Sequence, residues 1–486
     1  MCALVLAGNL SRMRNINYDN NPIKNPREDV LAQGSESVIL YLQRMYQSAL
    51  SNGLEMINAN LKHFPVEALT VPKLHSLTLD DNLIEVLPAE MFVLSGLTML
   101  SLQRNRLKEI PPECGLLTSL VRLLLNDNHL TEIPLSFGLA KSLHEVDLQN
   151  NGEWQTPPPE VVRQGSGMVV NYLKKFGEAY ETQNLMLEAM KLEAFPRDCY
   201  RFMEHFRPLN PVPLRLISLC HNKVATLPDD INQLSMLEEL LLDENEFESF
   251  PEALGELNCL RKLSFCKNYF NSFPVQVSAC SRLQSLRFSE NAMVRIHPGV
   301  GNLTLLTELQ VDFDKIVEPS IDVLTQGCAA TVRYLGQINQ ALTTFHLNLP
   351  NFKLVSFPPE LVNTPTHPVP QAGRLLTVLL PGNKMETIPT TMSALTLMTK
   401  LDLSDNKLTR ISVVMGAWAR LEYLDMSGNS ISELPSTLGN LRRLQVLRLS
   451  DNKLTALPPY MAKLTNLHEL FLGGNQLQVT CRVKLS

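Results

Sequence analysis

The chain has 486 residues, 44% of them hydrophobic, and its 43 lysines and arginines against 49 aspartates and glutamates give a net charge of −6. This composition excludes general disorder, and the charge balance gives no basic footprint for a nucleic acid. Its nine cysteines are too sparse for a disulfide-stapled secreted scaffold, and no apolar run reaches the roughly 20 residues of a membrane-spanning helix. We therefore expect a cytoplasmic protein without a membrane span.

Residues 1–25 open the chain with the apolar run MCALVLAG. The run carries no positive leader and no small-residue cleavage site, and it is short for the core of a signal peptide. Leu4, Leu6 and Asn9 fit the register of the repeat that follows. We therefore interpret this segment as partial N-terminal repeats.

A 23-residue step organises most of the remaining chain, as in LHSLTLDDNLIEVLP and LTMLSLQRNRLKEIP. Alternating leucines such as Leu77 and Leu79 predict a short strand with one buried face. An asparagine follows each strand where the chain must turn, and we expect its amide to bond the backbone of the next coil. These structural asparagines are Asn82, Asn105, Asn128, Asn151, Asn222, Asn245, Asn268, Asn291, Asn383, Asn406, Asn429, Asn452 and Asn475.

The step is interrupted three times by segments of one design. Each segment has a glycine, at position 34, 165 or 327, followed seven residues later by a tyrosine and then by a leucine. In the first copy Val38, Tyr41, Leu42 and Met45 follow helical spacing, which predicts an amphipathic helix of about four turns laid against the stack. The glycines, which stand alone in Gln-Gly pairs, indicate a turn or the start of a helix.

The coil after each interruption lacks the asparagine and holds Ala59, Met190 or Phe352 in its place. These side chains cannot bond the next coil, so we expect the ladder of asparagines to be broken at three places. The interruptions predict repeat blocks at 26–157, 158–319 and 320–486, and the last block ends in an uncapped repeat. Segments 208–213 and 365–370 share a Pro-x-x-Pro-Val-Pro spacing and are either stiff surface loops or peptides that dock in aromatic grooves.

The repeated frame of leucines, an asparagine and a final Leu-Pro resembles the leucine-rich-repeat superfamily over nearly the whole chain. Its 23-residue step is most similar to the intracellular Ras-group repeats. The resemblance implies an α/β fold, a right-handed solenoid (horseshoe) with a parallel β-sheet on the concave face, here with three helical insertions. A coil in such a solenoid has no core of its own and must stack on its neighbours.

Motifs for chemistry are missing from the sequence, which has no G-x-x-x-x-G-K-[ST] loop for phosphate, no H-E-x-x-H and no G-x-S-x-G. Cys220, His221 and Cys266 come nearest to a ligand cluster. Cys220 and Cys266 take the same outward strand position two coils apart, and two strand spacings of roughly 9 to 10 Å are too far for one zinc ion. We therefore predict no enzyme, no metal and no cofactor, and we interpret the cysteines as surface thiols.

The outward side chains of the stacked strands form rows on the concave face, the surface that such solenoids use for binding. The rows are acidic and polar in the first two blocks and richer in serine in the last. They are either a partner-binding site or only a solvated surface. The candidate partner-binding residues are Asp80, Gln103, Asn126, Glu145, Asp147, Gln149, Glu239, Asp243, Glu308, Asp312, Asp402 and Tyr423.

Two functions fit this sequence. The first is a non-enzymatic protein–protein interaction scaffold, and the resemblance to Ras-group repeats implies signalling assemblies with small GTPases, kinases or phosphatases. The second is the recognition arm of a larger enzyme, such as a Roco-type GTPase, a kinase or a ubiquitin ligase, whose catalytic domain lies outside this chain. The segment around PPPEVVRQG is similar to the stretch that closes repeat arrays ahead of such domains, but here the array restarts after it each time.

Overall fold

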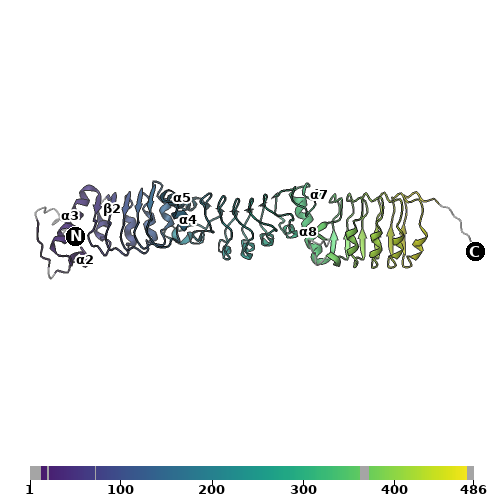
Figure 1. Cartoon of the computed structure of the whole chain (residues 1–486), viewed down its shortest axis with the longest axis horizontal. Coiled ribbons are helices and arrows are strands. Elements are labelled where there is room, and N and C mark those ends of the chain that lie inside the picture. The colour runs from purple at the N-terminus through teal and green to yellow at the C-terminus, as the bar shows by residue number, and fades with distance from the viewer. Residues whose placement is uncertain (1–12, 19–20, 72, 362–371, 479–486) are drawn as a thin grey trace, which may run out of the picture. The chain divides into compact units, whose positions relative to one another are not determined.

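The computed structural model describes residues 13–18, 21–71, 73–361 and 372–478, and its elements carry the labels of Figure 1. The chain packs as two units, Met1–Phe247 and Glu248–Ser486. Each unit is a stack of similar coils, and a typical coil holds a three-residue strand and a short 3-10 helix. The expected α/β solenoid with parallel strands and inserted helices is confirmed.

The coil that begins with β2 (Ser76–Thr78) shows how the repeated sequence builds one turn. Alternate residues of a strand point to the same side, so Leu77 and Leu79 both face the interior of the coil, and both side chains are fully buried. β2 pairs in parallel with β3 (Met99–Ser101), so equal positions of successive coils stand side by side. After the strand, Asp81 turns the chain with a left-handed φ of 57°. The chain then returns along the opposite side through the 3-10 helix η2 (Ala89–Val93).

Unit 1 holds two runs of parallel strands separated by helices. The strands are β1 (Gly53–Glu55), β2, β3, β4 (Arg122–Leu124), β5 (Glu145–Asp147), β6 (Asn184–Met186), β7 (Leu216–Ser218) and β8 (Glu239–Leu241). The α-helices are α2 (Glu28–Leu31), α3 (Ser35–Ser51), α4 (Pro159–Val162), α5 (Ser166–Thr182) and α6 (Phe202–His205). The 3-10 helices are η1 (Val66–Thr70), η2, η3 (Pro112–Leu116), η4 (Leu135–Leu139), η5 (Arg197–Cys199), η6 (Arg207–Leu209) and η7 (Ile231–Gln233). β1 to β5 pair in chain order, as do β6 to β8.

Unit 2 repeats the plan. Its strands are β9 (Lys262–Ser264), β10 (Ser285–Arg287), β11 (Glu308–Gln310), β12 (His346–Asn348), β13 (Thr377–Leu379), β14 (Lys400–Asp402), β15 (Tyr423–Asp425), β16 (Val446–Arg448) and β17 (Glu469–Phe471). Its α-helices are α7 (Ile321–Leu324) and α8 (Cys328–Thr344). Its 3-10 helices are η8 (Glu252–Glu256), η9 (Val275–Ala279), η10 (Pro298–Asn302), η11 (Pro359–Leu361), η12 (Ala372–Arg374), η13 (Thr390–Ala394), η14 (Val413–Ala417), η15 (Ser436–Asn440) and η16 (Pro459–Lys463). β9 to β11 pair in chain order, and β12 to β17 form one parallel sheet.

The three interruptions of the repeat are helical junctions, each with a one-turn helix, a glycine and a helix of 17 residues. Gly34, Gly165 and Gly327 have φ values of 88°, 90° and 93°, a backbone conformation that a side chain would strain. The long helices α3, α5 and α8 begin at the next residue, so the predicted turn and helix start are confirmed. In unit 1 the first sheet ends with β5 before α5, and pairing resumes with β6 after it.

A buried hydrogen bond from a tyrosine to a carboxylate fixes each long helix to the coil that follows. In the second junction the hydroxyl of Tyr172 donates to Oδ2 of Asp198 at 2.5 Å. The corresponding pairs are Tyr41 with Glu67 at 2.8 Å and Tyr334 with Glu360 at 2.9 Å. Burial raises the pKa of Tyr172 well above its usual value, so the hydroxyl keeps its proton and remains a donor. The tyrosine at fixed spacing from each glycine therefore docks the helix.

The blocks at 26–157, 158–319 and 320–486 stay a prediction about domains. A helical junction lies near the start of each block, but the division between the two units falls at 247, inside the second block. Residues 1–12 and 479–486, which include parts of the predicted terminal repeats, lie outside the described residues, as does segment 365–370. Segment 208–213 includes the end of η6 and continues without regular structure.

Candidate functional site

The asparagines at the bends hold the outward faces of the sheets in register. Nδ2 of Asn105 donates to the carbonyl of Leu79 at 2.9 Å, and Oδ1 accepts from the amide of Ile84 at 3.1 Å. Both partners lie in the preceding coil. We expected the asparagine to bond the next coil, and this prediction is wrong, because the bonds run to the coil before it. The same two bonds to the preceding coil are made by Asn128, Asn151, Asn245, Asn291, Asn406, Asn429, Asn452 and Asn475.

The three coils without an asparagine receive hydrogen bonds from both sides, but their own side chains add no rung to the ladder, as expected, and the sheets are interrupted before β6 and before β12. Oδ1 of Asn222 accepts from the amide of Met190 at 3.0 Å, because the bonding group belongs to the following coil. Nε2 of Gln164, the residue before the junction glycine, donates to the carbonyl of Met190 at 2.8 Å. The corresponding bonds are Asn82 to the amide of Ala59, Gln33 to the carbonyl of Ala59, Asn383 to the amide of Leu354 and Gln326 to the carbonyl of Phe352.

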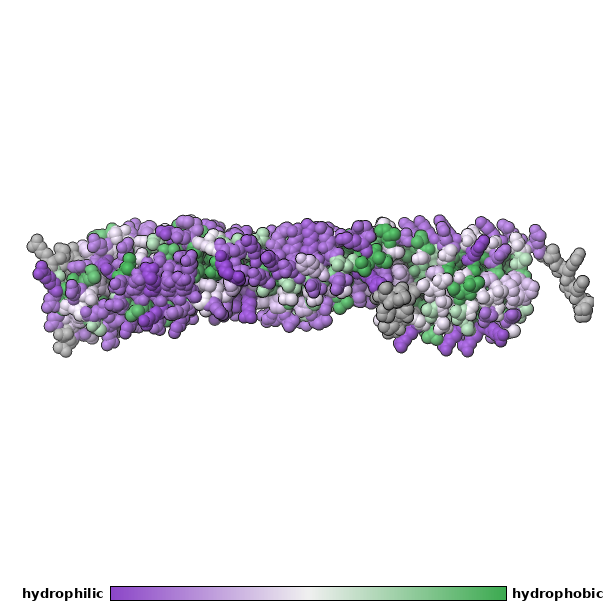
Figure 2. Space-filling model, viewed as in Figure 1, coloured by the Kyte–Doolittle hydropathy of each residue, from purple (hydrophilic) through white to green (hydrophobic). Residues whose placement is uncertain are grey.

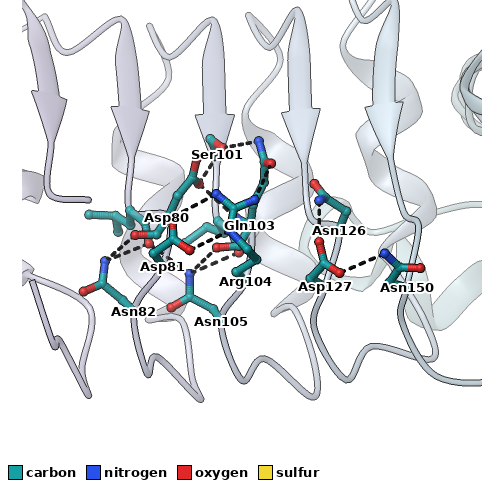
Figure 3. A network of polar contacts seen from close by, with 12 residues as sticks. Asp80, Asp81, Asn82, Ser101, Gln103, Arg104, Asn105, Asn126, Asp127 and Asn150 are labelled. Carbon is teal, nitrogen blue, oxygen red and sulfur yellow. Dashed lines mark hydrogen bonds and ion pairs between the residues drawn. The ribbon is translucent and has the colours of Figure 1, made fainter. Parts of the chain in front are cut away.

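A network of polar side chains covers the outward face of the first sheet in unit 1 (Figure 3). Asp80, which the sequence places in the exposed row, is only 8% exposed, and its Oδ1 accepts from Oγ of Ser101 at 2.6 Å and from the amide of Gln103 at 3.0 Å. The guanidinium of Arg104 donates two hydrogen bonds to the carboxylate of Asp81 in the preceding coil, from Nε to Oδ1 at 2.5 Å and from Nη2 to Oδ2 at 2.8 Å. The hydrogen bond from Arg104 holds the pKa of Asp81 below its usual value.

The same face continues with further pairs between successive coils. Nε of Arg122 lies 2.5 Å from Oε2 of Glu145, and the hydrogen bond lowers the pKa of Glu145. Asp127 accepts hydrogen bonds from the amide groups of Asn126 and Asn150, each at 2.8 Å. Most of the charge on this face is thus paired within the face, which leaves little of it for a partner.

The outward face of the last sheet in unit 2 alternates cations with aromatic rings. Nζ of Lys400 lies 4.7 Å from the ring centre of Tyr423, and the guanidinium of Arg448 lies 5.7 Å from the same ring. Arg448 also stands 4.9 Å from the ring centre of Phe471, which is 42% exposed. Burial, followed by the nearby Asp425, raises the pKa of Tyr423 to about 12, so its hydroxyl stays protonated. In the view of Figure 2, white and green residues are more frequent over these C-terminal coils than over the N-terminal ones.

The candidate partner-binding residues from the sequence do not form one site. Asp80 is buried, which corrects its assignment to an accessible row; Gln149 and Glu308 are exposed. The remaining candidates are half-buried: Gln103, Asn126, Glu145, Asp147, Glu239, Asp243, Asp312, Asp402 and Tyr423. Sequence reasoning missed Arg448 and Phe471, although both stand at the third position of their strands, in line with Asp402. A comparison of third strand positions at the 23-residue step would have found them.

Five of the cysteines in the described ranges are buried, so they are not the surface thiols that the sequence predicted, whereas Cys259 and Cys328 are half-buried. Cys220 and Cys266 are 9% and 8% exposed, and Cys114, Cys199 and Cys280 are also buried. Small side chains two residues before the asparagine are covered by the next coil, as where Oγ of Ser289 donates to Sγ of Cys266 at 3.3 Å. Burial raises the pKa of Cys220. Within the described ranges, no group of three histidines, cysteines or acidic residues is placed to hold a metal ion.

A groove of about 990 Å³ in unit 1 lies beside the first proline-rich segment. Pro208 and Arg201 line one wall, and Glu132 lines another. Arg201 forms ion pairs with Glu132 at 2.5 Å and with Glu204 at 3.0 Å, so these three charges of the groove are paired with one another. Segment 208–213 is mostly exposed, and the hydroxyl of Tyr180 donates to its Leu209 carbonyl at 3.1 Å, which favours its interpretation as a surface loop.

Comparisons with known proteins agree with this architecture. A leucine-rich repeat region family matches residues 190–414, and a leucine rich repeat family matches residues 72–130 and 419–477. The chain is a leucine-rich-repeat protein, a class whose domains generally serve protein interaction. No curated protein matches it at a significant level. No helix in the described part of the chain is long and apolar enough to cross a bilayer.

Solved structures share the repeat at low identity. A leucine-rich-repeat protein of Leptospira interrogans is 23% identical, with 89% of this chain and 93% of that chain covered and a TM-score of 0.26. The ectodomain of the Arabidopsis thaliana receptor kinase GASSHO1/SCHENGEN3, in complex with CASPARIAN STRIP INTEGRITY FACTOR 2, is 22% identical over 85% of this chain and 43% of that one, with a TM-score of 0.24. The Arabidopsis receptor kinase HAESA, in complex with the peptide hormone IDA and the co-receptor SERK1, is 21% identical over 88% and 71%, with a TM-score of 0.24.

Proposed function

We propose that this chain is a non-enzymatic protein-interaction scaffold that binds a protein partner on the outward face of β12 to β17. The observation that carries the proposal is the row of Lys400, Tyr423, Arg448 and Phe471, in which cations and aromatic rings contact one another across successive strands. Tyrosine and arginine are enriched among the residues that dominate binding energy in protein interfaces. The face of the first sheet lacks such a row and pairs its charges internally.

The partners and setting that we propose follow from the sequence. The 23-residue step and its Leu-Pro ending are similar to those of the intracellular Ras-group repeats, which favours intracellular signalling in the cytoplasm. Small GTPases and kinase or phosphatase complexes are therefore the first partners to test. The absence of recognised catalytic motifs in the sequence supports a scaffold rather than an enzyme.

The proposal is tested with partners identified by proximity labelling of the full-length protein and then measured as purified proteins. We expect Tyr423→Ala and Arg448→Ala each to weaken binding about tenfold or more, because a truncated anchor in an interface loses a large share of the binding energy. Arg122→Ala, a matched change on the face of the first sheet, should alter the affinity by less than about twofold. Partners that bind both variants of the last sheet as tightly as the wild type would contradict the proposal.

A further inference from the structure

A polar groove of about 410 Å³ opens where α8 meets the end of β12 in unit 2. Arg333 and Gln337 line it from the helix, and Asn348, Asn351 and Phe352 line it from the strand and the following bend. Asn348 is the third residue of β12 and pairs in register with Leu379 of β13, so the groove adjoins the face that carries the proposed function. Arg333, Asn348 and Asn351 are exposed to solvent.

The groove is a cluster of hydrogen-bond donors without an acid. Arg333 is the one charged residue of α8, whose sequence is CAATVRYLGQINQALTT. Its guanidinium lies 5.6 Å from the ring centre of Phe352, which is only 8% exposed and therefore provides a fixed platform for it. No carboxylate of the described residues forms an ion pair with Arg333, and the other polar side chains named in the groove are amides. A planar guanidinium that lies on a ring keeps its remaining N–H groups available for a ligand.

The other two junctions carry acids where this groove has none. In the first junction Glu55 occupies the third strand position that Asn348 occupies here. In the second junction Glu188 takes the place of Pro350, and its Oε1 accepts from Oγ of Ser218 at 2.7 Å. Lys175, which takes the place of Gln337, is held by Glu178 at 3.0 Å. The third junction therefore lacks these carboxylates, and it carries its cation at Arg333, where the second junction has Asn171.

We infer that this groove binds the side-chain carboxylate of an aspartate or glutamate in an extended segment of the partner protein, with Arg333 as the anchoring cation. The inference rests on the proposed function, because it assigns one acidic residue of the partner to the edge of the same sheet. A guanidinium and a carboxylate form two parallel hydrogen bonds, and neighbouring amide groups satisfy the remaining lone pairs of the carboxylate. One arginine suits one negative charge, whereas phosphate groups in proteins are usually met by clusters of arginines.

A library of short random peptides displayed on phage, selected against the full chain and against Arg333→Glu, tests the inference directly. We expect peptides selected by the wild type to hold aspartate or glutamate at one fixed position, and Arg333→Glu to select lysine or arginine there. A selected acidic peptide is then synthesised, and its affinity is measured by fluorescence anisotropy. We expect its affinity for Arg333→Ala to be lower by about tenfold or more. For Arg333→Lys the loss should be several-fold, since lysine keeps the charge but cannot form two parallel hydrogen bonds with a carboxylate. Equal melting temperatures would show that the variants are folded.

Control variants separate this inference from the proposed function. Lys175→Ala, at the paired cation of the second junction, should leave the peptide affinity unchanged. Peptides that bind the wild type and Arg333→Glu equally, yet lose affinity for Tyr423→Ala, would overturn the inference and leave the proposed function standing. If no peptide is enriched and no partner depends on Tyr423, both are overturned. A phosphoserine peptide that binds more tightly than its glutamate counterpart would also contradict the choice of a carboxylate.

Discussion

The second and third helical junctions share one backbone plan and differ in the chemistry buried beneath the helix. In the second, Asp198 accepts hydrogen bonds from the hydroxyls of Thr156 and Tyr172, each at 2.5 Å. In the third, Glu318 stands where Thr156 stands in the second, and the one hydroxyl that donates to Glu360 is that of Tyr334, at 2.9 Å, among the described residues. The second oxygen of Glu360 is buried and has no hydrogen-bond partner in the described part of the chain.

This difference shows that a long helix can dock on its coil whether the buried carboxylate has two hydroxyl donors, as Asp198 has, or one, as Glu360 has. Burial is the main cause of a raised pKa in both junctions, to about 6 for Asp198 and to about 7 for Glu360. Two hydroxyl donors and the nearby Arg201 favour the charged form of Asp198. Glu318 instead adds a second negative charge beside Glu360. The third junction is therefore the one that should respond more to pH.

The largest expected effect concerns how closely each long helix packs on the preceding coil. A Cβ added at Gly177 of α5 would lie 2.3 Å from the carbonyl oxygen of Gly138, whereas one added at Gly336 of α8 would lie 3.3 Å from that of Gly301. We expect Gly177→Ala to lower the free energy of unfolding by roughly 2 to 3 kcal/mol, because backbone atoms would have to move. Gly336→Ala should change it by less than about 1 kcal/mol, since alanine also favours the helix.

Chemical denaturation of both variants measures this contrast. Gly167→Ala, near the start of α5, serves as a control because an added Cβ there meets no atom within 4 Å. Equal losses from Gly177→Ala and Gly336→Ala would show that the two helices are packed alike.

The next effect separates the two buried carboxyl groups by pH. Because folding raises the pKa of Glu360 from 4.5 to about 7, the folded chain holds this proton more tightly than the unfolded chain. The free energy of unfolding should therefore fall as the pH rises from about 4.5 through 7. Glu360→Gln removes the ionisation and should raise the free energy of unfolding at pH 8 relative to the wild type, while the gain disappears near pH 4.

Melting temperatures between pH 4 and 8 check this prediction. Asp198→Asn is the matched change in the second junction, and its gain at high pH should be smaller, because the ionised Asp198 has two hydroxyl donors. A pH profile of Glu360→Gln that runs parallel to that of the wild type would exclude Glu360 as the titrating group.

The smallest effect concerns the glutamine that the two junctions share. Gln164 and Gln326 each donate to the carbonyl of the coil after their helix, at 2.8 and 2.7 Å. Replacing either one with alanine should cost about 1 kcal/mol, the usual net value of one hydrogen bond. Amide hydrogen exchange should become faster in the coil at 184–192 for Gln164→Ala and at 346–354 for Gln326→Ala. Gln340→Ala, an exposed change on α8, should leave the exchange unaltered.

The sequence predicted the parts of this fold that a period can reveal. The 23-residue step located the strands and asparagines, and the glycine-to-tyrosine spacing located α3, α5 and α8. A period shows which residues are equivalent, but it does not show on which side of a coil their partners lie. The direction of the asparagine bonds and the glutamine at the junctions therefore required coordinates.

The candidate faces were less predictable than the strands. The row containing Asp80 and Cys220 points outward, yet both residues are buried, because neighbouring coils cover short side chains. The longer side chain of Arg448 is partly accessible, and Phe471 is exposed on β17, the last strand of the sheet, whose three residues are all exposed. Whether a residue of a stacked strand is accessible thus depends on the length of its side chain and on the residue 23 positions away. A repeat pattern identifies equivalent positions, but it does not predict how neighbouring side chains cover one another.

The bonds of Asn105 to the amide of Ile84 and the carbonyl of Leu79 give the stack a direction. In regular coils such as this one, the bend is completed by the asparagine of the following coil. On the ribosome the chain emerges from its N-terminus, so each newly made bend waits for one more coil before its backbone groups are satisfied. Nascent chains that pause after a whole number of coils should therefore always end in one unfinished bend, and growth of the folded stack should trail synthesis by one repeat.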